Sequence, residues 1–177
     1  KIAYLENYRK KIINKYTTKS IGCSAEACNS FFLDTTKAIV INNIYDAIRF
    51  NPKLYTHQNG EELRILHVGR FCETKNQLFS LDILHQLQKQ IKNVKLSFVG
   101  FDTGGYEKLI KDKIKLLNLE EYVYFYPGDA DIPQLLSKST AFIFPSLHEG
   151  FGIALIEAQA MGVKCFASNG VPSSANC

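Results

Sequence analysis

Short apolar runs and longer segments with helically spaced apolar residues alternate along the chain from residue 64 to residue 167. Short runs of this kind are typical of strands, whereas longer segments with apolar positions three or four apart are typical of helices. Strands are predicted at residues 64–68, 94–99, 122–126, 141–144 and 164–167. Helices are predicted at residues 76–91, 106–117 and 132–137, with a further helix spanning Glu149 to Glu157.

This alternation predicts an α/β fold, a Rossmann-like, doubly wound parallel sheet with helices on both faces. In such sheets ligands bind at the carboxyl ends of the strands. Gly69, Gly100, Gly128 and Ser146 follow four of the predicted strands and are therefore expected along one ligand-binding edge. Residues 171–177 begin another connection with no helix to cover the last strand, so we expect the domain to be truncated at its C-terminus.

The N-terminal part of the chain has a different pattern. Residues 1–17 predict an amphipathic helix, residues 25–32 a short helix after Ser24, residues 38–41 a brief strand, and residues 51–62 a polar loop. The amphipathic helix has two interpretations: it packs on a neighbouring domain with its lysines in water, or it rests on an anionic membrane surface. The first is favoured because lysines are common on protein surfaces.

Composition and charge narrow the class of protein. The 177 residues are 46% hydrophobic and 21% charged, as in ordinary globular proteins. The net charge of +4 arises in the first 20 residues, since the remainder holds 15 basic and 16 acidic side chains. A nucleic-acid-binding surface is therefore not predicted. The five cysteines lack the spacing of a zinc or redox motif, so we expect reduced thiols, a cytoplasmic location and no structural metal.

Two carboxylates stand at either end of an almost wholly apolar segment. From residue 153 to residue 161 only Glu157 and Gln159 are polar, so most of this helix is expected to be buried. A buried carboxylate is costly unless hydrogen bonds satisfy it. No Lys or Arg stands three or four positions from Glu157, so its partner must come from elsewhere in the fold or from a ligand. Sugar and ribose hydroxyls suit it, since each donates a charge-assisted hydrogen bond.

A second polar group lies where the strand at residues 64–68 gives way to a helix. It consists of Gly69-Arg70 and Lys75-Asn76. The two cations could hold a diphosphate from two sides, with the positive end of the helix adding to them. Solvated side chains are the common alternative for cations in a loop. We favour the phosphate interpretation because phosphate-binding and hydroxyl-binding groups together define a nucleotide-sugar site.

Gly150-Phe151-Gly152 opens the last predicted helix directly after Glu149. Glycines let backbone amides turn towards a ligand, and a helix N-terminus favours a negative group such as a phosphate. Glu149 could then accept bonds from sugar hydroxyls, while Glu157 could reach a ribose. The alternative is a glycine-rich turn followed by a capping Glu. We favour the ligand interpretation because the sequence shows no cationic partner for either acid.

Together these residues resemble the C-terminal domain of GT-B glycosyltransferases and, within that fold, family 4, the retaining group 1 glycosyltransferases. The resemblance rests on Gly69-Arg70 with Lys75-Asn76, Phe98-Val99-Gly100, Pro145-Ser146, Glu149-Gly150-Phe151-Gly152, Glu157-Ala158 and Val171-Pro172. In addition, Asn43-Ile44-Tyr45-Asp46 is similar to the Asn-Gly-Ile-Asp that opens this domain in many members. The resemblance implies that residues 1–37 end an N-terminal domain and its linker. Residues 38–177 would then be the C-terminal nucleotide-sugar-binding domain.

Carried over by position, the resemblance implies a complete donor site. Arg70 and Lys75 would bind the diphosphate and stabilise the departing nucleotide, and Glu149 would hold the donor sugar, which makes these three the catalytic residues. Glu157 would hold the ribose. The other implied donor-binding residues are Gly69, Gly150, Phe151 and Gly152, with Tyr126, Pro127 and Gly128 beside the base. Family members need no metal, so no cofactor is expected besides the nucleotide-diphosphate sugar substrate.

The resemblance also implies a hexosyltransferase that modifies a glycan or lipid-linked acceptor in surface polysaccharide synthesis, with peripheral contact at the inner face of the membrane. The acceptor-binding N-terminal domain is not expected within these residues, so this piece should bind donor without turnover. A nucleotide-sugar epimerase and a non-catalytic partner subunit are the alternatives within this fold. The sequence departs from the family pattern at Lys164, where many members have Pro, and at Ser173-Ser174, where an acid is common. His148 adjoins the site, either against the sugar or as an ordinary loop residue.

Overall fold

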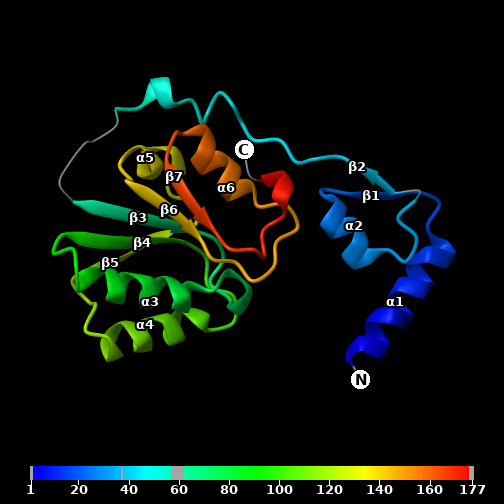
Figure 1. Ribbon diagram of the computed structural model, residues 1–177, viewed down its shortest axis with the longest axis horizontal. Coiled ribbons are helices and arrows are strands. Elements are labelled where there is room, and N and C mark those ends of the chain that lie inside the picture. The colour runs from blue at the N-terminus through cyan, green and yellow to red at the C-terminus, as the bar shows by residue number, and fades with distance from the viewer. Residues whose placement is uncertain (1, 37, 57–61, 176–177) are drawn as a thin grey trace.

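The computed structural model describes residues 2–36, 38–56 and 62–175, and at its centre is a five-stranded parallel sheet (Figure 1). The strands are β3 (Leu63–Val68), β4 (Val94–Gly100), β5 (Val123–Pro127), β6 (Ala141–Phe144) and β7 (Lys164–Ala167). Their order across the sheet is β5-β4-β3-β6-β7. The predicted doubly wound α/β fold is confirmed, and every strand predicted for this sheet overlaps its observed counterpart.

Helices cover both faces of the sheet. In Figure 1, α3 (Gln77–Gln88) and α4 (Tyr106–Leu116) lie below it, whereas α5 (Ile132–Ser137) and α6 (Ile153–Ala160) lie above it. The prediction of a helix that starts at Glu149 is wrong in its first residues. Gly152 has a φ of 90° in the left-handed region, so the right-handed helix begins only at Ile153 and leaves Glu149 in a loop.

The topology changes direction between β3 and β6. From β3 the chain proceeds to β4 and β5 on one side, then returns to place β6 and β7 on the other side. Leu66 pairs with Phe142 across the two neighbouring strands, so the segments that leave their carboxyl ends start side by side. Ligands of doubly wound sheets bind in the crevice at such a switch point.

Alternating residues of β3 contribute to two separate cores. Leu66 and Val68 belong to the core under α5 and α6, together with Phe142, Phe144 and Leu155. Ile65 belongs to the opposite core, which packs against α3 and α4. The two-residue period of a strand explains this division, because successive side chains point to opposite faces. Both faces of the central strand are therefore anchored, which fixes where its carboxyl end lies.

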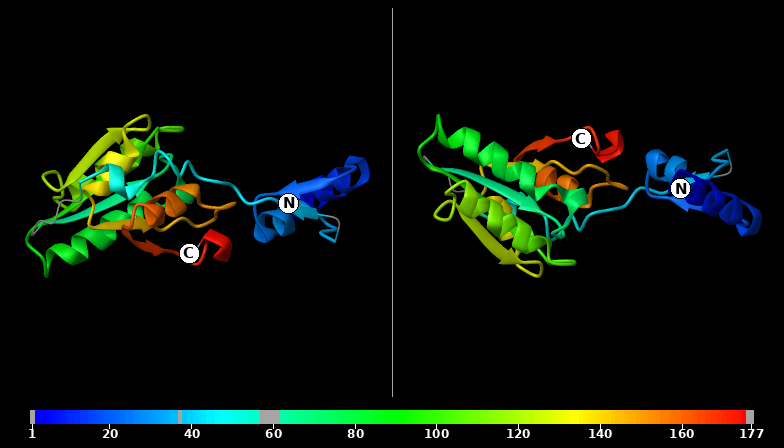
Figure 2. Two further views of the ribbon diagram at one scale, coloured as in Figure 1. Left: turned by 90° about the horizontal axis from the view of Figure 1, so that it is seen from above. Right: turned by 90° about the horizontal axis from the view of Figure 1, so that it is seen from below.

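The N-terminal segment lies to one side of the sheet in all views (Figures 1 and 2). It comprises α1 (Ile2–Tyr16), α2 (Ala25–Phe31) and a small parallel pair of strands, β1 (Ser20–Gly22) and β2 (Ala38–Val40). The two helices and β2 were predicted. The domain boundary between residues 37 and 38 stays a prediction. None of the helices within the described ranges combines the length and the apolar character needed to cross a bilayer.

Short 3-10 turns lie in the connections at Pro52–Leu54, Glu73–Lys75 and Ser173–Ala175. The first of them falls in the predicted polar loop at residues 51–62, of which residues 57–61 lie outside the described ranges. The apolar face of α1 remains largely exposed, with Leu5 at 64% and Tyr16 at 73%. Either interpretation of this helix, a neighbouring domain or a membrane surface, would cover that face.

His67 is a buried polar side chain at the carboxyl end of β3. It is 1% exposed, and its Nδ1 lies 2.9 Å from the Ser80 hydroxyl on α3. Its ring packs edge-on against Phe98, and Nε2 has no hydrogen-bond partner in the described part of the chain. Burial lowers the pKa of His67 to about 3, and the positive charge of Lys75 acts in the same direction. The imidazole is therefore neutral in the folded protein at neutral pH.

We expect the stability to fall when the pH drops below 6.5, the ordinary pKa of His67, because only the unfolded chain then protonates this side chain. Between pH 6.5 and about 3 this effect lowers the free energy of unfolding by up to about 1.4 kcal/mol per pH unit. Urea unfolding at pH 8 and at pH 5 should show it in the parent and not in His67→Asn. An equal pH dependence in both proteins would contradict the prediction.

Candidate functional site

Lys75 reaches the carboxyl end of β3 along the backbone of Gly69. A Cβ atom at Gly69 would lie 3.2 Å from Lys75 Cδ and 3.3 Å from Cγ, so the lysine stem packs directly on this glycine. The next residue, Asn76, has a φ of 57° and ends the 3-10 turn before α3. This local geometry carries the Lys75 side chain back over the strand end instead of letting it extend into solvent.

The Lys75 ammonium forms an ion pair with Oε1 of Glu149, which comes from the loop after β6. The two side chains are only 16% and 12% exposed. Lys75 Nζ also lies 4.9 Å from the centre of the Phe144 ring, in a cation–π contact. The interpretation of Glu149 as an acid without a cationic partner is wrong, because its partner is 74 positions away in the sequence. The structure brings the predicted cation and the predicted acid together.

Backbone and amide hydrogen bonds hold the loops after β3 and β6 together. Asn76 Nδ2 donates to the Pro145 carbonyl at 3.2 Å, and the Leu147 N–H donates to the Thr74 carbonyl at 2.8 Å. The loop after β6 is also held on its other side, where the Glu149 N–H donates to the Gly170 carbonyl at 3.1 Å. Glu149 is therefore positioned by its backbone as well as by Lys75.

The turn Gly150–Gly152 presents unused backbone donors. Gly152 caps α6 without a side-chain hydrogen bond, and the N–H groups of Phe151 and Gly152 have no acceptor within the described ranges. The Phe151 side chain is 5% exposed and packs inward, so it anchors the turn. Free N–H groups at the start of a helix form a ready anion-binding position.

These groups surround one pocket of about 380 Å³ at the switch point of the sheet. Of the predicted site residues, it is lined by Gly69, Arg70, Lys75, Glu149, Gly150, Phe151 and Gly152. Arg70 is exposed and has no ion-pair partner among the described residues, while its carbonyl accepts a hydrogen bond from Gln77 Nε2 at 2.8 Å. The pocket thus combines a free guanidinium, a neutralised lysine–glutamate pair and free amides.

Glu157 lies one turn into α6 and does not line this pocket. It is partly buried, and its side chain forms no hydrogen bond or ion pair with any residue that the structure describes. Burial raises the pKa of Glu157 above its ordinary value, while the positive charge of Arg49 acts in the opposite direction. The expected carboxylate without an internal partner is therefore present, and Arg49 is the nearby cation that the sequence analysis missed.

The residues predicted to flank a base are not brought to the pocket. Tyr126 and Pro127 end β5, the edge strand, two strands away from β3. The Tyr126 side chain instead lines a separate pocket of about 300 Å³ together with Arg64 and Lys95. Gly128 packs against Phe101, because a Cβ atom there would lie 2.2 Å from this ring. Their role in base binding stays a prediction.

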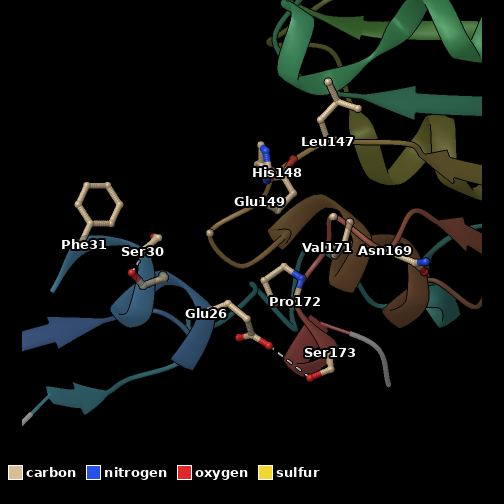
Figure 3. A pocket seen from close by; sticks show the side chains of 13 residues that line it. Glu26, Ser30, Phe31, Leu147, His148, Glu149, Asn169, Val171, Pro172 and Ser173 are labelled. Carbon is tan, nitrogen blue, oxygen red and sulfur yellow. Dashed lines mark hydrogen bonds between the residues drawn. The ribbon is translucent and has the colours of Figure 1, made fainter. Parts of the chain in front are cut away.

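A larger hollow of about 890 Å³ opens on the other side of the same loop (Figure 3). α2 contributes Glu26, Ser30 and Phe31 to one wall, and Leu147–Gly150 with residues 169–173 form the other. In Figure 3 the carboxylate of Glu26 points at Ser173, whose hydroxyl donates to Oε1 at 3.5 Å. His148 lines this hollow, and Glu149 and Gly150 border both cavities.

Residues of the N-terminal segment take part in the site, although the sequence analysis assigned them no role there. Cys23 and Asn43 line the smaller pocket, and the Ser24 hydroxyl donates to the Gly150 carbonyl at 2.7 Å. Asn43 belonged to the segment that resembles the domain opening, and Ser24 was seen only as the start of a helix. Contacts over such sequence separations have no local signal in a single sequence.

Comparison with known proteins identifies the family of this chain. The family model described as "Glycosyl transferases group 1" matches residues 55–176. The capsular polysaccharide biosynthesis glycosyltransferase CapH of Staphylococcus aureus is 32% identical over 154 residues, which cover 76% of this chain and 43% of CapH. The Escherichia coli UDP-Gal:alpha-D-GlcNAc-diphosphoundecaprenol alpha-1,3-galactosyltransferase is 29% identical over 158 residues, covering 81% of this chain and 40% of the enzyme.

Among solved structures, Anabaena Alr3699/HepE in complex with UDP and glucose superposes with a TM-score of 0.78 at 23% identity, over 92% of this chain and 47% of that protein. A parallel five-stranded sheet with a pocket at its switch point is typical of Rossmann-like domains, and the superposition matches this one to the GT-B type. The chain belongs to the group 1 glycosyltransferases, as the match of the family model shows. It spans less than half the length of these relatives.

The buried ion pair makes Lys75 more important for stability than Arg70. We expect Lys75→Ala to lower the free energy of unfolding by about 2 kcal/mol, because Glu149 is then left largely buried without a cation. Arg70→Ala, the matched control on the exposed side of the same loop, should change it by less than about 0.5 kcal/mol. Urea denaturation measures both values. Equal losses in the two variants would show that the ion pair is not what stabilises the loops.

Proposed function

We propose that this chain is the donor-binding part of a retaining glycosyltransferase that transfers a hexose from a nucleotide-diphosphate sugar. The observation that carries the proposal is the convergence of Arg70, Lys75 and Glu149 with the free amides of Phe151 and Gly152 around one pocket. Positive charge, amide donors and a carboxylate are the groups that a diphosphate and a hydroxylated sugar require.

The diphosphate lies between the loop after β3 and the start of α6 in this proposal. Arg70 offers a planar fork of donors from the exposed side of the pocket. Lys75 has three N–H donors, so it can keep its bond to Glu149 while it donates to a phosphate oxygen. The amides of Phe151 and Gly152 complete the ring of donors, and the N-terminus of α6 adds positive potential.

The two carboxylates bind hydroxyl groups. Glu149 uses only Oε1 for Lys75, so Oε2 remains available as an acceptor for a hydroxyl of the donor sugar. No residue in the described part of the chain donates a hydrogen bond to the Glu157 carboxylate, which is proposed to accept from the ribose. The base, in this proposal, lies beside Tyr126, Pro127 and Gly128 at the end of β5.

Transfer proceeds with retention by attack of the acceptor hydroxyl on the face that the nucleotide leaves. The bond between the anomeric carbon and the phosphate oxygen breaks, a bond to the acceptor oxygen forms, and the acceptor proton passes to the leaving phosphate. Arg70 and Lys75 stabilise the negative charge that develops on this leaving group. These two cations supply the electrostatic stabilisation, so the proposed reaction uses no metal.

The rest of the proposed activity depends on a longer protein. CapH acts in capsular polysaccharide biosynthesis, and the Escherichia coli galactosyltransferase acts on a diphosphoundecaprenol-linked acceptor. By analogy, we place this chain in surface polysaccharide synthesis on a glycan or lipid-linked acceptor, in the cytoplasm at the inner face of the membrane. The acceptor site belongs to an N-terminal domain, which these residues lack in this proposal. The chain alone therefore binds donor without turnover.

Isothermal titration calorimetry with UDP, GDP, UDP-hexoses and GDP-hexoses tests the proposal. At least one of these should bind, and Glu157→Gln should weaken binding about tenfold, because a neutral amide replaces a charged acceptor of the ribose. Glu120→Gln, an exposed acid before β5 at the opposite end of the strands, is the matched control and should bind as the parent does. A folded chain that binds none of these nucleotides would refute the proposed function.

The raised pKa of Glu157 also predicts a pH dependence of binding. The ribose hydroxyls donate to the ionised carboxylate, so affinity should decrease as the pH falls through this raised pKa and the carboxyl becomes protonated. Titrations at pH 7.5 and pH 5 with the nucleotide that binds tightest should show a larger loss in the parent than in Glu157→Gln. Because Glu157→Gln has no carboxyl group at this position, any loss of affinity in this variant reports the titration of the ligand phosphate instead. Identical losses would mean that Glu157 does not contact the ligand.

A further inference from the structure

We infer that Ser24, from the N-terminal segment, is a positioning residue for the donor site: its hydroxyl fixes the orientation of the Gly150–Phe151 peptide and thereby aims the Phe151 N–H. The inference rests on the proposed function, in which this N–H donates to the diphosphate. Ser24 lies outside residues 55–176, the part matched by the family model. It is also not among the donor-binding residues that the resemblance implies.

The buried Ser24 hydroxyl both donates and accepts a hydrogen bond. Ser24 is 0% exposed, and its Oγ lies 2.7 Å from the Gly150 carbonyl oxygen, 126 positions away in the sequence. The same Oγ accepts the Ala27 N–H at 2.9 Å and so caps α2. A hydroxyl has one proton to donate, and here it goes to Gly150. The Cys23 thiol makes a second, weaker contact with the same carbonyl at 3.4 Å.

Peptide geometry transmits this bond to the next residue. The bond between Gly150 and Phe151 is trans and planar, so the carbonyl of Gly150 and the N–H of Phe151 point in opposite directions. A hydrogen bond that holds the carbonyl towards Ser24 therefore holds the N–H away from Ser24. That N–H has no acceptor in the described part of the chain, which leaves it available to a ligand of the pocket it borders.

Other contacts of the loop do not fix this peptide. Glu149 is held by Gly170 and Lys75, and Phe151 is held by the burial of its ring. Gly150 between them is exposed and has no side chain, so its peptide can rotate about soft dihedral angles. Among the described residues, only Cys23 and Ser24 bond to its carbonyl. Ser24 supplies the shorter bond and so restricts the rotation most.

The test compares three variants of the 177-residue chain by calorimetry with UDP and GDP. Ser24→Ala removes the donor to Gly150 and the cap of α2, and we expect it to raise the dissociation constant of the bound nucleotide about fivefold. Ser24→Asp keeps an acceptor that can cap α2 but cannot donate to a carbonyl, so it should lose at least as much affinity. Ser30→Ala, on the same helix, removes a hydroxyl that bonds to Ala27 O and to no other residue in the described ranges, so this variant should bind as the parent does.

Nuclear magnetic resonance separates positioning from helix capping. Saturating nucleotide should shift the Phe151 amide signal in the parent and much less in both Ser24 variants, whereas amide exchange at Ala27 should rise only in Ser24→Ala. Parent-like affinity and a parent-like Phe151 shift in Ser24→Ala would overturn the inference while leaving the proposed function intact. Failure of the unsubstituted chain to bind UDP, GDP or any of their hexose derivatives would overturn both.

Discussion

The bond between Lys75 and Glu149 is the interaction on which the site depends. It joins the loop after β3 to the loop after β6, the two segments that leave the sheet at its switch point. Each partner is also held by a contact of its own, since the side-chain stem of Lys75 packs on Gly69 and the Glu149 N–H donates to the Gly170 carbonyl. The parallel sheet sets the distance between the loops. The ion pair then holds Lys75 and Glu149 together across that distance, and both residues line the pocket.

Much of the fold could be predicted from local patterns of apolar and polar residues. The apolar runs predicted every strand of the central sheet, and they are clearest in β6, which is buried along its whole length between the two cores. The edge strands β5 and β7 are more exposed, yet most of their residues are apolar as well. The start of α6 was misplaced because the apolar pattern continues through Phe151, whereas the left-handed φ of Gly152 delays the helix. The backbone conformation of a glycine cannot be predicted from the spacing of apolar residues.

The site was predicted as a set of residues, but not as a set of contacts. The resemblance to group 1 glycosyltransferases named Lys75 and Glu149 separately, and the lack of a nearby cation in the sequence suggested a lone acid. The same reasoning succeeded for Glu157, because a residue inside a helix has few neighbours besides those on its own helix and the core. The role of Ser24 could not be predicted from the sequence, because its partner is a main-chain carbonyl, which every residue type carries.

Glu149 and Gly150 form a partition between the pocket at the switch point and the hollow beside α2. A substitution in this partition reshapes two compartments at once, however small the exchanged side chain. Any movement of Glu149 or Gly150 therefore alters the walls of both cavities together, because each of these residues lines both.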